Sequence, residues 1–363
     1  MYSPFQNDLA RAINARGVDY HVIYTVNRKN QRTENQRGKH WTAHIESEEY
    51  IHKLFEWRDT ADLARQLNPL LERLAPDAIV ATGILRASTF AALQRASKPI
   101  RSIPTGYWLE LPNLSGRLGR RIAIEAVVRY QLRKMDFVLA IGDRAQRFYQ
   151  RCHPSLPVHM VPYGQDLSHH FAIQRSPAER PIRFLFSGQL LPRNNIENLC
   201  KALSRLALSH PRQWEFVVAA NGPEEPTVLA LQAQTRRAGW DSVRFDRTYE
   251  TWLDRIRPFA DSHVLVCPSR HAGWALVVPE AMAAGMPVIA TRYVNAARYF
   301  CRPEVNGLTV QTDVDSIYRA LRRFVDEPAA IDRMGLQARH AAQAGTAEFI
   351  AELFLNAVQQ HIR

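Results

Sequence analysis

Short apolar runs rich in β-branched residues alternate with longer amphipathic segments along the whole chain. The runs have the length of buried strands, and the segments repeat apolar residues with the period of a helix. Alternation of this kind builds parallel sheets with helices on both faces, so the pattern predicts an α/β chain with doubly wound sheets. The expected strands are 19–25, 77–81, 100–104, 137–141, 183–186, 215–219, 243–245, 263–267 and 288–291. The expected helices are 60–74, 88–97, 118–134, 145–152, 196–208, 226–238, 249–259, 279–284, 313–325, 329–342 and 346–362.

A polar, proline-containing stretch over 166–181 separates two series of these elements. A length of 363 residues also fits two domains. We therefore expect an N-terminal domain over 1–165, a hinge over 166–181, a C-terminal domain over 182–345, and a last helix over 346–363 that packs back on the body. In doubly wound domains, ligands bind at the carboxyl ends of the strands.

The composition limits the class of protein. Hydrophobic residues make up 46% of the chain and charged residues 23%, which excludes wholesale disorder. The four cysteines are far apart and form no C-x-x-C pair, which favours a reducing compartment and argues against a structural zinc site. His40 and His44 have a ligand-like spacing but no evident third ligand, so no metal site is expected. The chain has neither an apolar signal region nor a run of 18 apolar residues, and we expect it in the cytoplasm.

The formal charge of +12 is concentrated in the first half of the chain. The residues up to Phe171 carry +8 and the rest +4. The densest stretch has one acid, Glu125, and predicts a basic amphipathic helix whose cations are Arg117, Arg120, Arg121, Arg129, Arg133 and Lys134. These cations fit a solvated helix face, or contact with an anionic acceptor or with anionic lipid at the inner face of the membrane. Nucleic acid is not expected, because no recognised binding motif accompanies the charge.

The most informative segment is PSRHAGWALVVPEAMAAGMPVIAT, residues 268–291. An expected strand ends at Cys267, a glycine-containing loop follows, and a helix is expected from Pro279. Backbone N–H groups in a loop that enters a helix can bind a phosphate. The spacing alone leaves two roles open for Glu280, a ligand contact or a carboxylate that complements the helix dipole.

This segment resembles the signature of family 4 retaining GT-B glycosyltransferases (glycosyl transferases group 1), typically P-S-x-x-E-G-x-G-x-x-x-x-E-A-x-A-x-G-x-P-V-x-A. The positions in register are Ser269, Gly273, Glu280, Ala281, Ala283, Gly285, Pro287, Val288 and Ala290. Further family elements are resembled by SGQLLPRNN, AANGPEE, FADSHVLVCPSR and EVNGLTV, and more weakly by AIGDRAQRFY and VPYGQDLSHHF in the first half.

The resemblance implies a GT-B fold, with two Rossmann-like domains facing across a cleft. The N-terminal domain would bind the acceptor and the C-terminal domain the nucleotide sugar. It implies a metal-independent hexosyltransferase that needs no cofactor. Such an enzyme would move a sugar, with retention, from a nucleotide-diphosphate donor to a glycan or lipid-linked acceptor. The usual role of such enzymes implies surface polysaccharide or lipopolysaccharide assembly as the pathway.

The resemblance also implies residue roles. Arg193 and Glu280 are the expected catalytic residues, and Glu280 would bind the ribose hydroxyls. The backbone amides of 273–276 would face the distal phosphate and the sugar. The full implied donor set is Gly188, Gln189, Asn194, Asn221, Gly222, Ala272, Gly273, Trp274, Ala275, Leu276 and Glu280.

The chain departs from the family pattern in the donor loops. Ala272 replaces a glutamate that contacts the donor sugar in the family. Gln189 stands where arginine is common and Asn194 where lysine is usual, which leaves Arg193 as the one cation of that loop. These losses motivate an alternative interpretation, a catalytically weakened GT-B protein that binds nucleotide or glycan. A sugar-nucleotide epimerase of the same architecture is a further alternative.

The acceptor residues implied for the N-terminal domain are Ser3, Pro4, Trp108 and Glu110. Residues 1–6 look like the family's acceptor loop with almost no strand before it. Either the domain lacks its first strand or the true start lies upstream. His169 and His170 lie in the expected hinge, where packing is favoured over catalysis.

Overall fold

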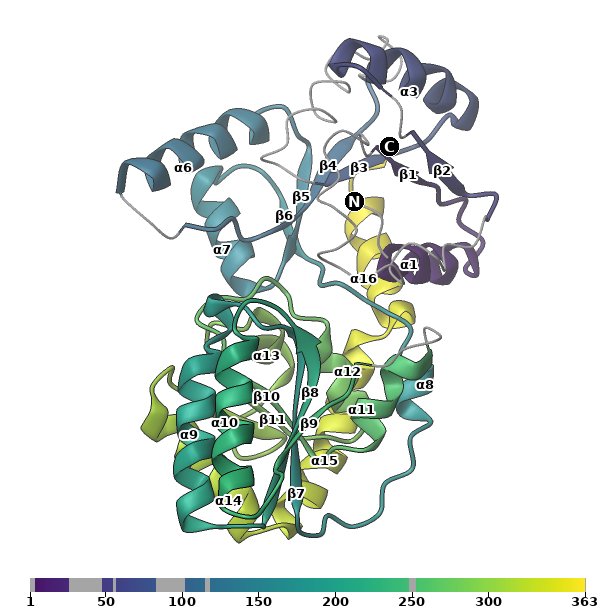
Figure 1. Cartoon of the computed structure of the whole chain (residues 1–363). Helices are drawn as coiled ribbons and strands as arrows, with labels where there is room; N and C mark the ends of the chain where they lie inside the picture. The colour runs from purple at the N-terminus through teal and green to yellow at the C-terminus, as the bar shows by residue number, and fades with distance from the viewer. Residues whose placement is uncertain are drawn as a thin grey trace. The chain divides into compact units, whose positions relative to one another are not determined.

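The computed structural model describes residues 4–25, 48–54, 57–82, 102–114, 118–247 and 253–362. The chain divides into two compact units (Figure 1). The first comprises residues 1–165 and 347–363, and the second comprises residues 166–346. The segment expected as a hinge, 166–181, thus belongs to the second unit, and the last helix belongs to the first.

The first unit contains two parallel sheets among its described residues. One has the strand order β3-β4-β5-β6, and the other is the pair β1-β2. The central strand β5 is buried at all five of its positions. The elements are α1 Pro4–Asn14, β1 Val22–Tyr24, β2 Ile51–Lys53, α3 Thr60–Leu74, β3 Ile79–Thr82, β4 Thr105–Glu110, α6 Leu118–Leu132, β5 Phe137–Ile141, α7 Asp143–Cys152, β6 Val158–Met160 and α16 Ala347–Gln359.

Two expectations for the first unit are wrong. The acceptor loop expected over 1–6 is helical from Pro4 onward, because Leu9 and Ile13 repeat at helical spacing and are buried. The strand expected over 100–104 begins instead at Thr105. Its predecessor Pro104 has no N–H to donate to a ladder. The helix expected over 88–97 lies outside the described residues.

The helix expected over 118–134 forms as α6, but only some of its apolar side chains face the interior. Only Val128, Gln131 and Leu132 of α6 are buried. Leu118 is 71% and Ile122 is 59% exposed. These two residues fall on a different side of the helix from Val128 at about 100° per residue. α6 therefore presents apolar and basic groups together.

The second unit contains a six-stranded parallel sheet with the order β12-β11-β10-β7-β8-β9. This is the order of a doubly wound nucleotide-binding fold, with β7 as its first strand and β10 as its fourth. Its elements are α8 Ser168–Phe171, β7 Ile182–Gln189, a 3-10 turn Pro192–Asn194, α9 Ile196–Ser209, β8 Trp214–Asn221, α10 Glu225–Arg237, β9 Val243–Phe245, a 3-10 turn Leu253–Ile256, α11 Arg257–Ala260, β10 Val264–Cys267, α12 Val277–Ala283, β11 Val288–Thr291, α13 Asn295–Phe300, β12 Gly307–Val310, α14 Val314–Asp326, α15 Ala329–Ala341 and a 3-10 turn Ala342–Gly345.

The helix expected over 249–259 is confirmed only at 257–259 among the described residues. Residues 253–256 form a 3-10 turn and α11 begins anew at Arg257. Pro258 lacks an N–H and suits the first turn of a helix, so it starts α11 rather than continuing a longer one.

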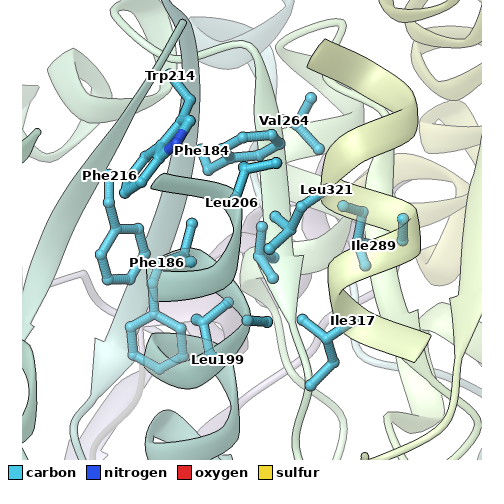
Figure 2. Packing of buried hydrophobic residues seen from close by; sticks show 14 of the residues in the cluster. Phe184, Phe186, Leu199, Leu206, Trp214, Phe216, Val264, Ile289, Ile317 and Leu321 are labelled. Atoms are coloured by element: carbon cyan, nitrogen blue, oxygen red, sulfur yellow. The ribbon is translucent and has the colours of Figure 1, made fainter. Parts of the chain in front are cut away.

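Alternate residues of β7 and β8 build the core of the second unit. Figure 2 shows Phe184 and Phe186 of β7 beside Trp214 and Phe216 of β8, with side chains of α9 and α14 packed near them. Each of these four aromatic residues is at most 3% exposed. Aromatic side chains bury about 150–250 Å² each, so this cluster provides much of the apolar burial that holds the sheet.

The segment 172–181 is fixed to the second unit rather than free. The guanidinium of Arg175 donates to the carbonyl oxygens of Phe259, Ser262 and Ala284. Burial lowers the pKa of Arg175 to about 10. Arg339 donates to the carbonyl oxygens of Phe171 and Ile173. The expected hinge is thus anchored by arginine side chains.

Candidate functional site

The sheet order of the second unit creates one position where a ligand can enter. β7 and β10 are adjacent, and the connections that leave their carboxyl ends run to opposite sides. In open parallel sheets this switch point leaves a crevice at the carboxyl edge. The loop over 190–195 leaves β7 there, and the loop over 268–276 leaves β10.

Hydrogen bonds bring together three segments that the sequence had singled out. The N–H of Arg270 donates to the carbonyl of Arg193 at 2.8 Å, which joins the β10 loop to the β7 loop. The N–H of Leu190 donates to the carbonyl of Asn221 at 2.7 Å, which joins the β7 loop to the end of β8. The expected donor residues of 188–194, 221–222 and 272–280 therefore lie at the same edge of one sheet.

Gly188 leaves room at this edge. It has a φ of +143°, which an L side chain rarely adopts, and a Cβ built there would meet no atom within 4 Å. Gly222 has a different role. Its φ is +146° and a Cβ would lie 2.6 Å from the carbonyl oxygen of Leu190. Gly222 therefore permits the β7 and β8 loops to approach each other.

Asn194 joins the two loops through its side chain. Its amide Nδ2 donates to the carbonyl of Gln189 at 2.6 Å, and its Oδ1 accepts from the Ser269 hydroxyl at 3.3 Å. Both ends of the amide are occupied by these contacts, so the structure gives Asn194 a bracing role at the position where the family has a lysine. The side chain of Gln189 is half-buried beside it.

Two arginine side chains are exposed where the loops meet. Among the described residues, the guanidinium of Arg193 makes no hydrogen bond or ion pair. Arg270 donates one hydrogen bond from its guanidinium to the carbonyl of Pro192 at 3.1 Å. Sequence reasoning missed Arg270, and only its position shortly after the expected strand end could have indicated it.

Hydrogen bonds from the segment after β11 fix the position of the loop after β10. The Thr291 hydroxyl donates to the carbonyl of Ser269 at 2.5 Å, and the N–H of Ala296 donates to the carbonyl of Trp274 at 2.9 Å. The indole of Trp274 is 2% exposed and packs on Tyr299 and Phe300. The side chain of Trp274 is therefore an anchor, and any ligand contact of this residue falls to its backbone.

Three consecutive amides of this loop have no partner within the described ranges. They belong to Gly273, Trp274 and Ala275. Ala275 has a φ of +68°, in the left-handed region. Successive N–H groups that alternate between right- and left-handed conformations form concave anion sites. The loop is thus suited to a phosphate, and it keeps this shape although Ala275 stands where the resembled pattern has its second glycine.

Glu280 lies a few residues further on, in α12. Its carboxylate is half-buried and has no hydrogen bond or ion pair to any residue that the structure describes. The carboxylate of Glu280 interacts electrostatically with the ring of His170 in α8. Burial lowers the pKa of His170, and Glu280 opposes that shift. His170 packs edge-on against Phe259 with ring centroids 5.1 Å apart, as a packing residue does.

The first unit has fewer candidate acceptor residues than the sequence predicted. The indole of Trp108 is 3% exposed and donates to the carbonyl of Val161 at 2.8 Å. This burial gives Trp108 a packing role in place of the predicted acceptor contact. Glu110 is half-buried at the end of β4. Burial and then the nearby charge of Glu110 raise the pKa of Tyr163. Glu110 stays a predicted acceptor residue.

Four of the residues singled out from the sequence lie outside the described ranges: Ser3, Arg117, His40 and His44. Pro4 opens α1. Within the described ranges, no group of three His, Cys, Asp or Glu residues is placed to hold a metal ion. The four cysteines are free thiols. No helix in those ranges has the length and apolar content to cross a membrane.

Comparisons with known proteins agree with this geometry. Residues 181–327 match the family described as glycosyl transferases group 1. The D-inositol 3-phosphate glycosyltransferase of Streptomyces griseus is 33% identical over 191 residues, which cover 49% of this chain and 40% of that protein. The lipopolysaccharide core biosynthesis mannosyltransferase LpcC of Rhizobium leguminosarum is 24% identical over 221 residues, which cover 56% of this chain and 58% of that protein. The chain thus matches about half the length of these relatives.

Solved structures show the fold. Sucrose-phosphate synthase from Thermosynechococcus elongatus superposes with a TM-score of 0.71 at 19% identity, covering 98% of this chain and 92% of that one. HepE from Anabaena, solved in complex with UDP and glucose, has a TM-score of 0.62 at 18% identity, covering 85% and 86%. These neighbours confirm the predicted GT-B class with two α/β units of parallel strands.

Proposed function

Because residues 181–327 match the family described as glycosyl transferases group 1, we propose that the protein transfers a sugar from a nucleotide-diphosphate donor to a glycan or lipid-linked acceptor. One observation carries the proposal. An unpaired carboxylate, three unpaired backbone amides and two exposed guanidinium groups, all within the described residues, gather at the switch point between β7 and β10. This set matches the ribose and the diphosphate of a nucleotide sugar.

The ribose and the diphosphate of the donor each have a fitting group. The carboxylate of Glu280 can accept hydrogen bonds from both ribose hydroxyls. The amides of Gly273, Trp274 and Ala275 can bind the distal phosphate. Arg193 and Arg270 can neutralise the diphosphate from the other loop. Gly188 leaves the space through which the donor approaches the sheet edge.

The proposed reaction retains the configuration of the sugar. The bond from C1 of the sugar to the phosphate oxygen breaks, and the leaving diphosphate takes the electron pair. The acceptor hydroxyl attacks C1 on the same face and gives its proton to a phosphate oxygen. Arg193, Arg270 and the loop amides stabilise the charge that develops on the diphosphate, which is the largest contribution a site of this kind can make. With this charge supplied by the protein, we propose that transfer needs no metal ion.

The pathway follows from the relatives. LpcC of Rhizobium leguminosarum is a lipopolysaccharide core mannosyltransferase, and we propose a related role in surface polysaccharide or lipopolysaccharide assembly. The proposed compartment is the cytoplasm. Glu110 is the proposed acceptor residue of the first unit, because its half-buried carboxylate lies at the carboxyl end of β4.

A donor panel tests the proposal. UDP-, GDP-, ADP- and dTDP-sugars are scored by thermal shift, since a ligand at about 100 times its Kd adds about 2.7 kcal/mol to the free energy of unfolding. The donor that binds is then incubated with lipopolysaccharide core or lipid-linked glycan acceptors. NMR of the new anomeric proton should show the donor's own configuration. Binding of no donor, or a product of inverted configuration, would refute the proposal.

A second candidate is favoured by Ala272. Its side chain has no polar atom to hold the donor sugar, so the site could bind nucleotide without efficient turnover. A protein of this kind would bind the nucleoside diphosphate as tightly as the sugar nucleotide and release no sugar from any donor. Sugar transfer that is lost in Glu280→Gln would exclude it.

A further inference from the structure

α6 carries an exposed surface that the sugar-transfer proposal does not use. Leu118, Ile122 and Tyr130 are 71%, 59% and 58% exposed. Val127 is also 44% exposed. Large apolar side chains gathered on one helix and open to solvent mark a contact surface rather than scattered surface residues.

Helical geometry places basic residues on this apolar face. At about 100° per residue, one arc of about 80° holds Leu118, Ile122, Ala126, Arg129 and Arg133. Arg133 directly follows the last residue of α6, and its N–H donates to the carbonyl of Arg129 as in a helical turn. The buried residues Val128 and Gln131 lie about 120° to 180° from the middle of this arc. The face that points away from the unit is thus apolar and cationic at once.

The carboxyl end of this face opens on a hollow of about 170 Å³. Its lining residues are Arg129, Arg133, Cys152, His153, Pro154 and Ser155. The guanidinium groups of Arg129 and Arg133 have no acidic partner in the described part of the chain. The Ser155 hydroxyl and the His153 ring, 3.3 Å apart, add polar hydrogen-bonding groups.

The one acid of α6 does not offset these cations. Glu125 pairs with Arg121 at 3.4 Å and with Arg151 of α7 at 4.0 Å. Lys134 adds another cation beside the apolar group, with its ammonium 5.4 Å from the centre of the Tyr130 ring. The surface is therefore cationic as a whole, and an anionic partner complements it.

We propose that α6 docks on a membrane, and that the hollow takes the phosphate of an anionic phospholipid headgroup. Arg129 and Arg133 bind the phosphate, because paired guanidinium groups match its oxygens. Leu118, Ile122 and Tyr130 enter the boundary between headgroups and acyl chains, as the apolar side chains of interfacial helices do. The proposal rests on the residues of the first unit and stands or falls separately from sugar transfer.

Co-sedimentation of the full chain with vesicles tests the headgroup site. Vesicles with about one third phosphatidylglycerol are compared with pure phosphatidylcholine at low ionic strength, where surface charge acts most strongly. We expect binding to the anionic vesicles alone. Arg129→Gln combined with Arg133→Gln should lower the partition coefficient about tenfold or more. The control Arg65→Gln with Arg73→Gln removes the same charge from α3 and should change partitioning far less.

A second pair of variants tests the apolar contact. Ile122→Ser with Tyr130→Ser should weaken vesicle binding about tenfold or more, since each side chain loses its burial in the lipid. The control is Leu208→Ser with Leu336→Ser, which removes exposed leucines of the second unit. All these side chains are exposed, so circular dichroism and Tm should stay unchanged.

Three results would overturn the proposal. The first is no preference for anionic vesicles at low salt. The second is an equal loss of binding in the α6 and α3 arginine pairs, which would leave only non-specific charge. The third is unchanged vesicle binding by the protein with Arg129→Gln and Arg133→Gln, which would show that the hollow does not bind the headgroup.

Discussion

The N–H of Arg270 donates a 2.8 Å hydrogen bond to the carbonyl oxygen of Arg193. This bond holds two cationic residues together at the carboxyl ends of β7 and β10. Like charges repel, and an anion between or above them removes that cost. The family's usual lysine is replaced by Asn194, whose amide braces the same two loops. The loop after β7 therefore has a second cation beside it, supplied by the neighbouring loop.

Loss of either arginine should slow sugar transfer. Arg193→Gln and Arg270→Gln should each lower kcat by about two to three orders of magnitude, because each removes charge stabilisation from the leaving diphosphate. Steady-state kinetics with the donor found by the panel gives the measurement. Arg237→Gln is the matched control, since Arg237 lies in the last turn of α10, at the opposite edge of the sheet. Full activity of Arg270→Gln would show that this residue only braces the loop.

Substitutions at two small residues with unusual backbone conformation should change the free energy of unfolding of the second unit. Ala275 has a φ of +68°, so Ala275→Gly should relieve strain and raise the free energy of unfolding by up to about 1 kcal/mol. Gly222→Ala should lower it by about 2 kcal/mol or more, because its Cβ would lie 2.6 Å from a backbone oxygen. Urea unfolding followed by circular dichroism compares the three proteins. A stabilising Gly222→Ala would contradict this description of the loops.

Acid should destabilise the second unit through His263. Burial and the guanidinium groups of Arg183 and Arg175 lower the pKa of His263 to about 4. The unfolded chain takes up this proton below its ordinary pKa of about 6.5, and the folded chain does so only near 4. Between these values the unfolded state binds more protons, so the free energy of unfolding falls as the pH falls from about 6.5 to about 4.

The variant His263→Gln separates this effect from other titrations. It cannot take up the proton, so its stability should depend less on pH over the same range. Urea unfolding at about pH 7 and about pH 5 measures the difference. Burial also lowers the pKa of His170. His170 should therefore contribute part of the pH dependence of stability in both the wild type and the variant. An identical slope in the wild type and the variant would refute the role of His263.

Most of the second unit could be predicted from the sequence because its local and global signals agree. The strands expected at 243–245 and 288–291 form at those positions. Pro279 and Glu280 mark the first turns of α12, which begins two residues earlier than expected. β10 and β11 are short apolar runs rich in β-branched residues, and all of their positions are buried.

The first unit was harder to predict because its apolar residues do not all face inward. On α6, apolar and basic residues are interleaved, and the exposed positions of Leu118 and Ile122 depend on which side packs against α7. Trp108 was expected at a site because it follows a strand end, but β4 starts later and buries it. The bond between Arg270 and Arg193 joins residues far apart in the chain, and no local pattern indicates it.

We propose that Glu280 holds the ribose of a nucleotide donor. Calorimetry measures binding of a nucleoside diphosphate and of its 2′,3′-dideoxy analogue to the wild type, to Glu280→Gln and to the control Glu215→Gln, a carboxylate at the amino end of β8. The wild type and the control should bind the ribose form about tenfold to a hundredfold more tightly, the value of charged hydrogen bonds to hydroxyls. Glu280→Gln should lose most of this discrimination and bind the dideoxy form with nearly unchanged affinity. Equal discrimination by the wild type and Glu280→Gln would contradict the claim.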